Sequence, residues 1–123
     1  MRPVKWKQGR GFLPQGGQGP NKTEVAYQQF LDLQKAAGEI HDYWWEGLKL
    51  RLAPKTFLTL DALIQKNDGS IELHDVKGNL IMPEAMVKMK VAAEKFPFPI
   101  FIVRQIPKRE GGGWSKTRVG RND

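Results

Sequence analysis

The chain has 123 residues, of which 40% are hydrophobic, so it has room for one compact domain with its own core. It contains no cysteine, which excludes a disulfide framework, thiolate chemistry and a zinc ribbon. The formal net charge of +7 predicts a polyanionic partner. No apolar run approaches membrane-spanning length and the first residues lack the apolar centre of a signal peptide, so we expect no membrane association and a cytoplasmic location.

The basic charge is concentrated at the two ends of the chain. Residues 1–20 carry four basic and no acidic side chains, and residues 104–123 carry six basic and two acidic ones, which leaves −1 for the middle. Both ends are rich in Gly and suit arms that follow a phosphate backbone, the alternative being solubilising tails. Trp6 and Trp114 in these ends would either stack on bases or dock on the core. The nucleic-acid contacts predicted in the ends are Lys5, Lys7, Arg10, Lys116 and Arg118.

The first helix is predicted directly after residues 1–20, which contain too much Gly and Pro for regular structure and form a flexible basic arm. Asn21 suits a helix N-cap, and Glu24 three residues later completes a capping box. The pattern therefore predicts a helix over residues 22–37. We expect the folded core to extend over residues 21–106, followed by a basic C-terminal tail over residues 107–123.

Three strands are predicted next, over residues 44–53, 56–65 and 70–78, from apolar alternation and from β-branched and aromatic content. Pro54 ends the first strand. The sequence Lys-Asn-Asp-Gly from Lys66 supplies turn chemistry for a hairpin between the second and third strands.

A second helix is predicted to begin at Met82-Pro83 and to end before Phe96, because Pro suits the first helical turn. Residues 99–103 then form a short, fully apolar strand that suits the interior of a sheet. The fold class expected is α/β, with a mixed central sheet of about four strands flanked by helices. The element order is helix, three-strand antiparallel meander, helix, strand.

Asp61 stands at the centre of an apolar strand, where an isolated charge is costly to bury. If residues 67–69 form a three-residue loop with Gly69 in the left-handed region, residues whose numbers sum to 136 face each other. Asp61 then lies opposite Asp75, with Lys77 on the same face. A two-residue Asp-Gly loop would instead place the two Asp side chains on opposite faces.

Two directly opposed carboxylates repel, and a hard divalent cation between them reverses the sign of the interaction. Asp61 and Asp75 therefore predict a Mg²⁺ site, with Lys77 placed to contact the attacking water or the charge on a phosphate. If the register is different, Glu72 and Asp68 are the alternative acids. His74 alternates onto the opposite face from Asp75 and is expected to be structural, as is His41.

Asp61, a hairpin turn and then Asp75-Val76-Lys77 resemble the signature of the PD-(D/E)XK nuclease superfamily. Over residues 21–106, the stretches NKTE, DGSIELHDVKG and KMKVAAEKFPFPIFIV are similar to a phage-encoded group of small Holliday-junction-resolvase-like endonucleases. The chain departs from the signature at Leu60, where Pro is usual, and at Asp75, where Glu is commoner.

The resemblance implies a restriction-endonuclease-like core and Mg²⁺-dependent hydrolysis of DNA phosphodiester bonds, with Mn²⁺ as a substitute. The substrate would be branched or Holliday-junction DNA in DNA recombination, in the host cytoplasm if the protein is phage-encoded. Glu24 would join the metal site, although a helix-capping role alone also explains it. Lys88 and Lys90 would approach substrate phosphates, although both also suit a solvated helix face.

Symmetric cleavage of two strands would require a homodimer, with a contact at Trp44-Trp45 or at residues 96–98. Two other functions stay open on the sequence alone. The first is a catalytically silent basic nucleic-acid-binding module, and the second is a nuclease without structure preference.

Overall fold

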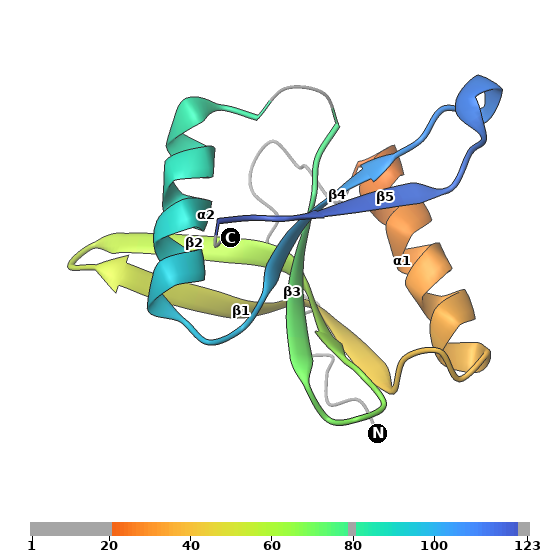
Figure 1. Cartoon of the computed structure of the whole chain (residues 1–123), viewed down its shortest axis with the longest axis horizontal. Helices are drawn as coiled ribbons and strands as arrows, with labels where there is room; N and C mark the ends of the chain where they lie inside the picture. Colours follow the sequence, from red (N-terminus) through yellow and green to blue (C-terminus); the bar gives the residue numbers. More distant parts are fainter. Residues whose placement is uncertain (1–20, 79–80, 121–123) are drawn as a thin grey trace.

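The computed structural model describes residues 21–78 and 81–120. The predicted N-terminal arm, with Lys5, Lys7 and Arg10, lies outside the described residues. Within the described residues, two α-helices accompany one five-stranded sheet in the strand order β1-β2-β3-β4-β5 (Figure 1). Neither helix in this part of the chain is long and apolar enough to cross a membrane.

Helix α1 (Lys22–Ala36) begins and ends within one residue of the predicted bounds. The capping box is present: the Glu24 backbone N–H donates to Asn21 Oδ1 at 2.8 Å, and the Asn21 N–H donates to Glu24 Oε1 at 3.2 Å. These bonds satisfy two of the donors that a helix start leaves without partners. They also fix the Glu24 carboxylate at the N-terminal end of the helix.

Strands β1 (Asp42–Ala53), β2 (Thr56–Gln65) and β3 (Ile71–Val76) form the predicted antiparallel meander. The loop between β2 and β3 has the predicted geometry, because Gly69 has a φ of 91° and its N–H donates to the Lys66 carbonyl oxygen at 2.9 Å. The pairs that follow it run from Gln65 with Ile71 to Ala62 with His74, so paired numbers sum to 136. The register predicted from the loop is confirmed.

The crossover from β3 runs through helix α2 (Pro83–Lys95) to strand β4 (Ile100–Gln105), which pairs with β3 in parallel. A short 3₁₀ helix, η2 (Lys108–Glu110), leads into strand β5 (Trp114–Arg118), which pairs antiparallel with β4. The sheet is mixed, as predicted, but β5 adds a strand within the segment that we expected to be a tail. Its short, polar sequence carries little strand signal, and the pairing with β4 supplies what its own residues lack.

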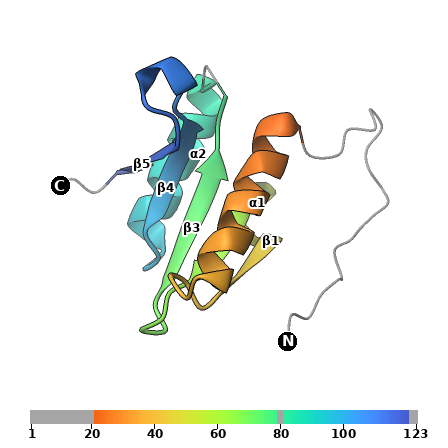
Figure 2. The same cartoon turned by 90° about the vertical axis from the view of Figure 1, so that its right-hand side faces the viewer.

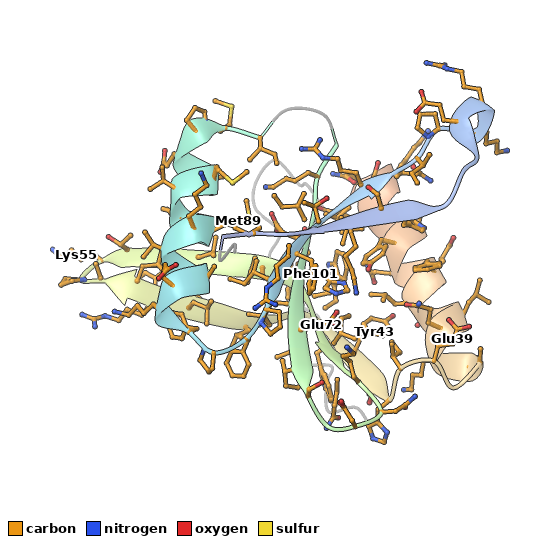
Figure 3. All side chains as sticks on the ribbon, in the orientation of Figure 1. Glu39, Tyr43, Lys55, Glu72, Met89 and Phe101 are labelled. Carbon is orange, nitrogen blue, oxygen red and sulfur yellow. The ribbon has the colours of Figure 1, made fainter. Side chains whose placement is uncertain are left out.

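The helices lie on either side of β3 in both views and cover two separate cores (Figures 1 and 2). Met89, fully buried, points from α2 into the larger core with Leu60, Leu73 and Ile100 (Figure 3). Helix α1 covers the second core, whose buried residues are Tyr27, Leu31, Ile40, Tyr43, Ala62, Ile64, Val76 and Val103. One strand, β3, therefore presents alternate side chains to the two helices.

Candidate active site

Backbone pairing of β2 with β3 extends to Ala62 with His74, and Asp61 and Asp75 occupy the next facing position. Asp61 reaches across the gap between the strands, and its Oδ2 accepts a hydrogen bond from the Val76 N–H at 2.8 Å. Asp75 is buried, with 6% of its surface exposed, and Asp61 is partly buried. The structure thus brings the two predicted acids together on one face of the hairpin.

The environment of Asp61 disfavours its charged form. Burial is the main cause, followed by the negative charge of Asp75, and together they raise the pKa of Asp61 to about 8 despite the opposing Val76 hydrogen bond. Glu24 contributes a smaller effect of the same sign. A site that penalises negative charge in this way is one where a bound cation gains free energy.

Lys77 is the cation next to this acid pair. Its Nζ lies 2.9 Å from Asp75 Oδ2, and its side chain is about a quarter exposed. Its backbone N–H donates to the Val103 carbonyl oxygen at 2.9 Å, which anchors this end of β3 to β4. The ammonium group is therefore held beside the carboxylates and can still be reached from solvent.

Glu24 enters the site from the N-terminal end of α1. Desolvation is the largest effect on its pKa and raises it, while the hydrogen bond from Asn21 opposes that rise. The charges of Asp75 and Lys77 also act on Glu24. Glu24 is thus a capping residue whose carboxylate is also influenced by the charges of the acid pair and Lys77, and its predicted role at a metal site stays a prediction.

Glu46 is a residue near the site that we did not predict. It lies where the β1–β2 register shifts between Trp45 and Leu48, and its φ of 54° is unusual for a residue other than Gly. Its negative charge raises the pKa of Glu24. The sequence signal was Gly47, since Gly inside a strand often marks a bulge.

The acid pair has the donor chemistry that a hard cation requires. The hydrogen bond from Val76 and the ion pair with Lys77 involve one oxygen, Oδ2, of each Asp carboxylate. Among the described residues, no group of three or more His, Cys, Asp or Glu side chains has the geometry to hold a metal ion. Two carboxylates nevertheless fit Mg²⁺, which keeps several waters and takes substrate phosphate as a ligand.

Within the described residues, the lysines and the arginine predicted to contact phosphate lie on α2 and β5 and differ in exposure and in ion pairing. Lys88 lies 3.7 Å from Glu84 in an ion pair on α2, and Lys90 is exposed on the same helix. Arg118 is exposed on β5, whereas Lys116 turns toward Glu72, with its Nζ 3.0 Å from Oε1. The structure does not gather these cations at the acid pair.

Comparison with known proteins found no matching family model, curated protein or solved structure.

Proposed function

We propose that this protein is a Mg²⁺-dependent endonuclease with a restriction-endonuclease-like core that hydrolyses phosphodiester bonds in branched DNA. The observation that carries the proposal is the β2–β3 register, which sets Asp61 opposite Asp75 beside Lys77. The basic ends of the chain and the net charge of +7 suit a phosphate-rich partner. The choice of branched DNA comes from the sequence resemblance alone.

Asp61 and Asp75 would hold Mg²⁺, or Mn²⁺ in its place, with Glu24 assisting directly or through water. When bound, the metal supplies a water of lowered pKa and neutralises charge on the scissile phosphate. The Val76 N–H holds Asp61 in place through the 2.8 Å hydrogen bond. Lys77, fixed by its ion pair with Asp75, orients the attacking water or stabilises charge on the phosphate.

A homodimer follows from the proposal if two strands are cut symmetrically. Both predicted contact segments pack against the chain's own cores. Trp45 packs against the second core, which α1 covers. Phe96 and Phe98 pack against the larger core, which contains Met89 of α2. Trp44 is partly buried. A contact at either segment would therefore use the faces of these side chains that the cores leave uncovered.

The proposal is tested by incubating a four-way DNA junction and a supercoiled plasmid with the full chain in EDTA, Mg²⁺ or Mn²⁺. Wild-type protein should cut the junction only with metal, and an Asp75→Asn variant should leave it intact. Equal cutting of branched and linear DNA would indicate a nuclease without structure preference. Intact DNA in every lane, with salt-sensitive binding, would contradict the proposal and favour the silent binding module.

A Glu24→Gln variant separates the two roles of this residue. Gln at this helix position can still accept the hydrogen bond from the Asn21 N–H, so we expect the free energy of unfolding to change by no more than about 0.5 kcal/mol. Cleavage should fall about 10- to 100-fold, as expected when a group supporting a metal site is lost. Urea denaturation and junction-cleavage rates measure the two effects. Unchanged cleavage would show that Glu24 only caps the helix.

A further inference from the structure

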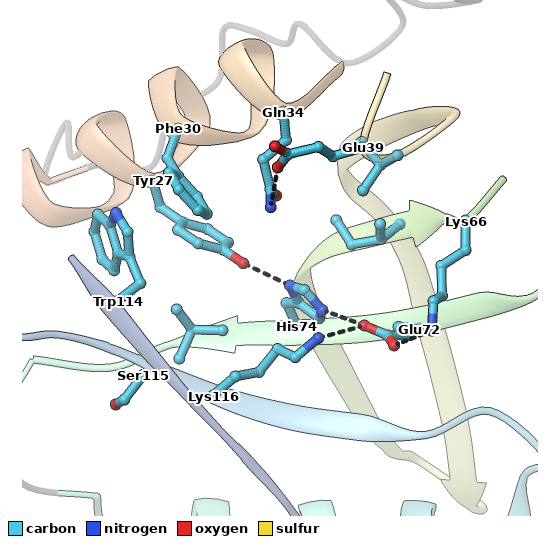
Figure 4. Close-up of a pocket in the computed structure, with 13 residues that line it drawn as sticks. Tyr27, Phe30, Gln34, Glu39, Lys66, Glu72, His74, Trp114, Ser115 and Lys116 are labelled. Atoms are coloured by element: carbon cyan, nitrogen blue, oxygen red, sulfur yellow. Dashed lines mark hydrogen bonds and ion pairs between the residues drawn. The ribbon is translucent and has the colours of Figure 1, made fainter. Parts of the chain in front are cut away.

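A cavity of about 310 Å³ lies between α1 and the sheet (Figure 4). Its lining residues Glu72 and His74 alternate with Asp75 along β3, so the cavity is on the face of β3 opposite to Asp75. We call it the α1 pocket. The residues that matter here are Tyr27 and Phe30 from α1, Glu72 and His74 from β3, and Trp114 and Lys116 from β5. Neither the acid pair nor Lys77 lines it, so the proposed nuclease chemistry does not account for it.

A buried hydrogen-bond chain forms the polar side of the α1 pocket. His74 lies between Tyr27 and Glu72, with its Nδ1 2.7 Å from the Tyr27 hydroxyl and its Nε2 2.9 Å from Glu72 Oε1. Burial lowers the pKa of His74, which favours the neutral ring. Since a carboxylate only accepts, Nε2–H donates to Glu72 and the Tyr27 hydroxyl donates to Nδ1. Both ring nitrogens of His74 therefore have hydrogen-bond partners within the protein, and these bonds fix the position of its ring at the pocket wall.

Two lysines complete the polar side at the pocket's mouth. Lys66 Nζ lies 3.1 Å from Glu72 Oε2, and Lys116 Nζ lies 3.0 Å from Oε1. The hydrogen bond from His74 is the main cause that holds the pKa of Glu72 well below its usual range, and the lysines add to it. The lysine side chains are 47% and 43% exposed, so their ammonium groups can also donate to an incoming anion.

Aromatic rings form the other side of the α1 pocket. Tyr27 is buried, and its ring packs against Trp114 and Phe30 with centroid distances of 4.9 Å and 5.7 Å. Phe30 and Trp114 are only partly buried and both line the cavity. Their rings offer an apolar surface on which a flat ligand can stack.

We propose that the α1 pocket binds one unpaired nucleotide, with its base against Phe30 and Trp114 and its phosphate at Lys66 and Lys116. Aromatic rings opposite ammonium groups match a ligand that is flat at one end and anionic at the other. The cavity lies at the small end of the range for ligand pockets, roughly 300–1,000 Å³, which suits one nucleotide and excludes a duplex. The nucleotide is either free or part of a DNA strand, and the strand form rests on the proposed nuclease function.

The test uses 2-aminopurine, a fluorescent base whose emission is quenched by stacking. One probe is its free deoxynucleoside monophosphate, and the other is a junction carrying it at an unpaired position, both with the full chain in EDTA. We expect wild-type protein to quench at least one probe. Trp114→Leu and Lys66→Met should each weaken that binding about tenfold. The matched control Lys95→Met, on α2, should bind as wild type.

Quenching of the free nucleotide would identify a mononucleotide ligand, and quenching of the junction alone would identify a substrate base. Absence of quenching with both probes, or equal quenching by wild type, Trp114→Leu and Lys66→Met, would overturn the proposal. Cleavage in Mg²⁺ is scored separately. Junction cleavage without quenching would support the proposed nuclease function and overturn the nucleotide pocket. Quenching of the free nucleotide without cleavage would support the pocket and contradict the nuclease function.

Discussion

Replacement of Asp61 by Asn is expected to abolish cleavage and to stabilise the fold. Burial and the neighbouring Asp75 penalise the Asp61 charge, whereas Asn is neutral and its oxygen can still accept the Val76 hydrogen bond. One pKa unit corresponds to about 1.4 kcal/mol. Because Asp61 is only partly buried and solvent screens its charge, we expect only a fraction of the full shift to appear as stability, a gain of about 1–2 kcal/mol at pH 8 without metal. Urea denaturation in EDTA measures the gain, and junction cleavage in Mg²⁺ measures the loss.

The raised pKa of Asp61 makes the free energy of unfolding depend on pH. The pKa of Asp61 rises from 3.8 to about 8 on folding, so between these values the folded state binds a proton that the unfolded state lacks. Rising pH therefore lowers the free energy of unfolding through this window, with no further Asp61 contribution above it. The Asn variant should lack this part of the slope, and its advantage over wild type should grow from pH 5 to pH 8.

Asp68→Asn is the matched control, because it removes the same charge from the same hairpin. Asp68 is exposed, and its Oδ1 accepts hydrogen bonds from the Ser70 N–H at 2.9 Å and from the Ser70 hydroxyl at 2.6 Å. These bonds lower the pKa of Asp68, so its stabilising contribution is lost as pH falls. The control should not stabilise the fold. An Asp61→Asn variant no more stable than wild type at pH 8 would show that the Asp61 charge is not penalised.

Local sequence signals predicted the part of the fold that forms the acid pair. The Asn21–Glu24 capping box sets the start of α1, and the loop ending in Gly69 sets the pairing of β2 with β3. Each signal lies within a few residues and reflects backbone hydrogen bonds made locally. Because side chains alternate along a strand, a correct loop was enough to place Asp61 opposite Asp75.

The features that were missed depend on contacts between distant segments. Strand β5 has a short polar sequence and is defined by its pairing with β4. The negative charge of Glu46, which lies at a bulge in β1, raises the pKa of Glu24. The α1 pocket combines residues from α1, β3 and β5, and His74 gave no local sign that Tyr27 would be its partner. Periodicity and turn chemistry do not carry such information.

Lys77→Met is expected to reduce the cleavage rate about 10²- to 10⁴-fold, the range that positioned catalytic groups contribute. The substitution keeps an unbranched side chain but removes the ammonium group that lies 2.9 Å from Asp75 Oδ2. Asp75 then stays buried beside Asp61 without this counterion, so the free energy of unfolding should also fall, by about 1–3 kcal/mol in EDTA. Single-turnover cleavage of a junction and urea denaturation measure the two losses.

A double variant, Asp75→Asn with Lys77→Met, separates chemistry from stability. Neutralising both partners removes the uncompensated buried charge, so the double variant should recover most of the stability that Lys77→Met loses. Its cleavage should be absent, because Asp75 is also lost. Junction binding in Ca²⁺ should stay within about threefold of wild type for Lys77→Met, because one cation among many contributes little to overall attraction. Lys95→Met controls for charge and should cleave normally. If Lys77→Met lost binding in proportion to cleavage, Lys77 would act by attracting DNA, and its placement beside Asp75 would not serve the chemical step.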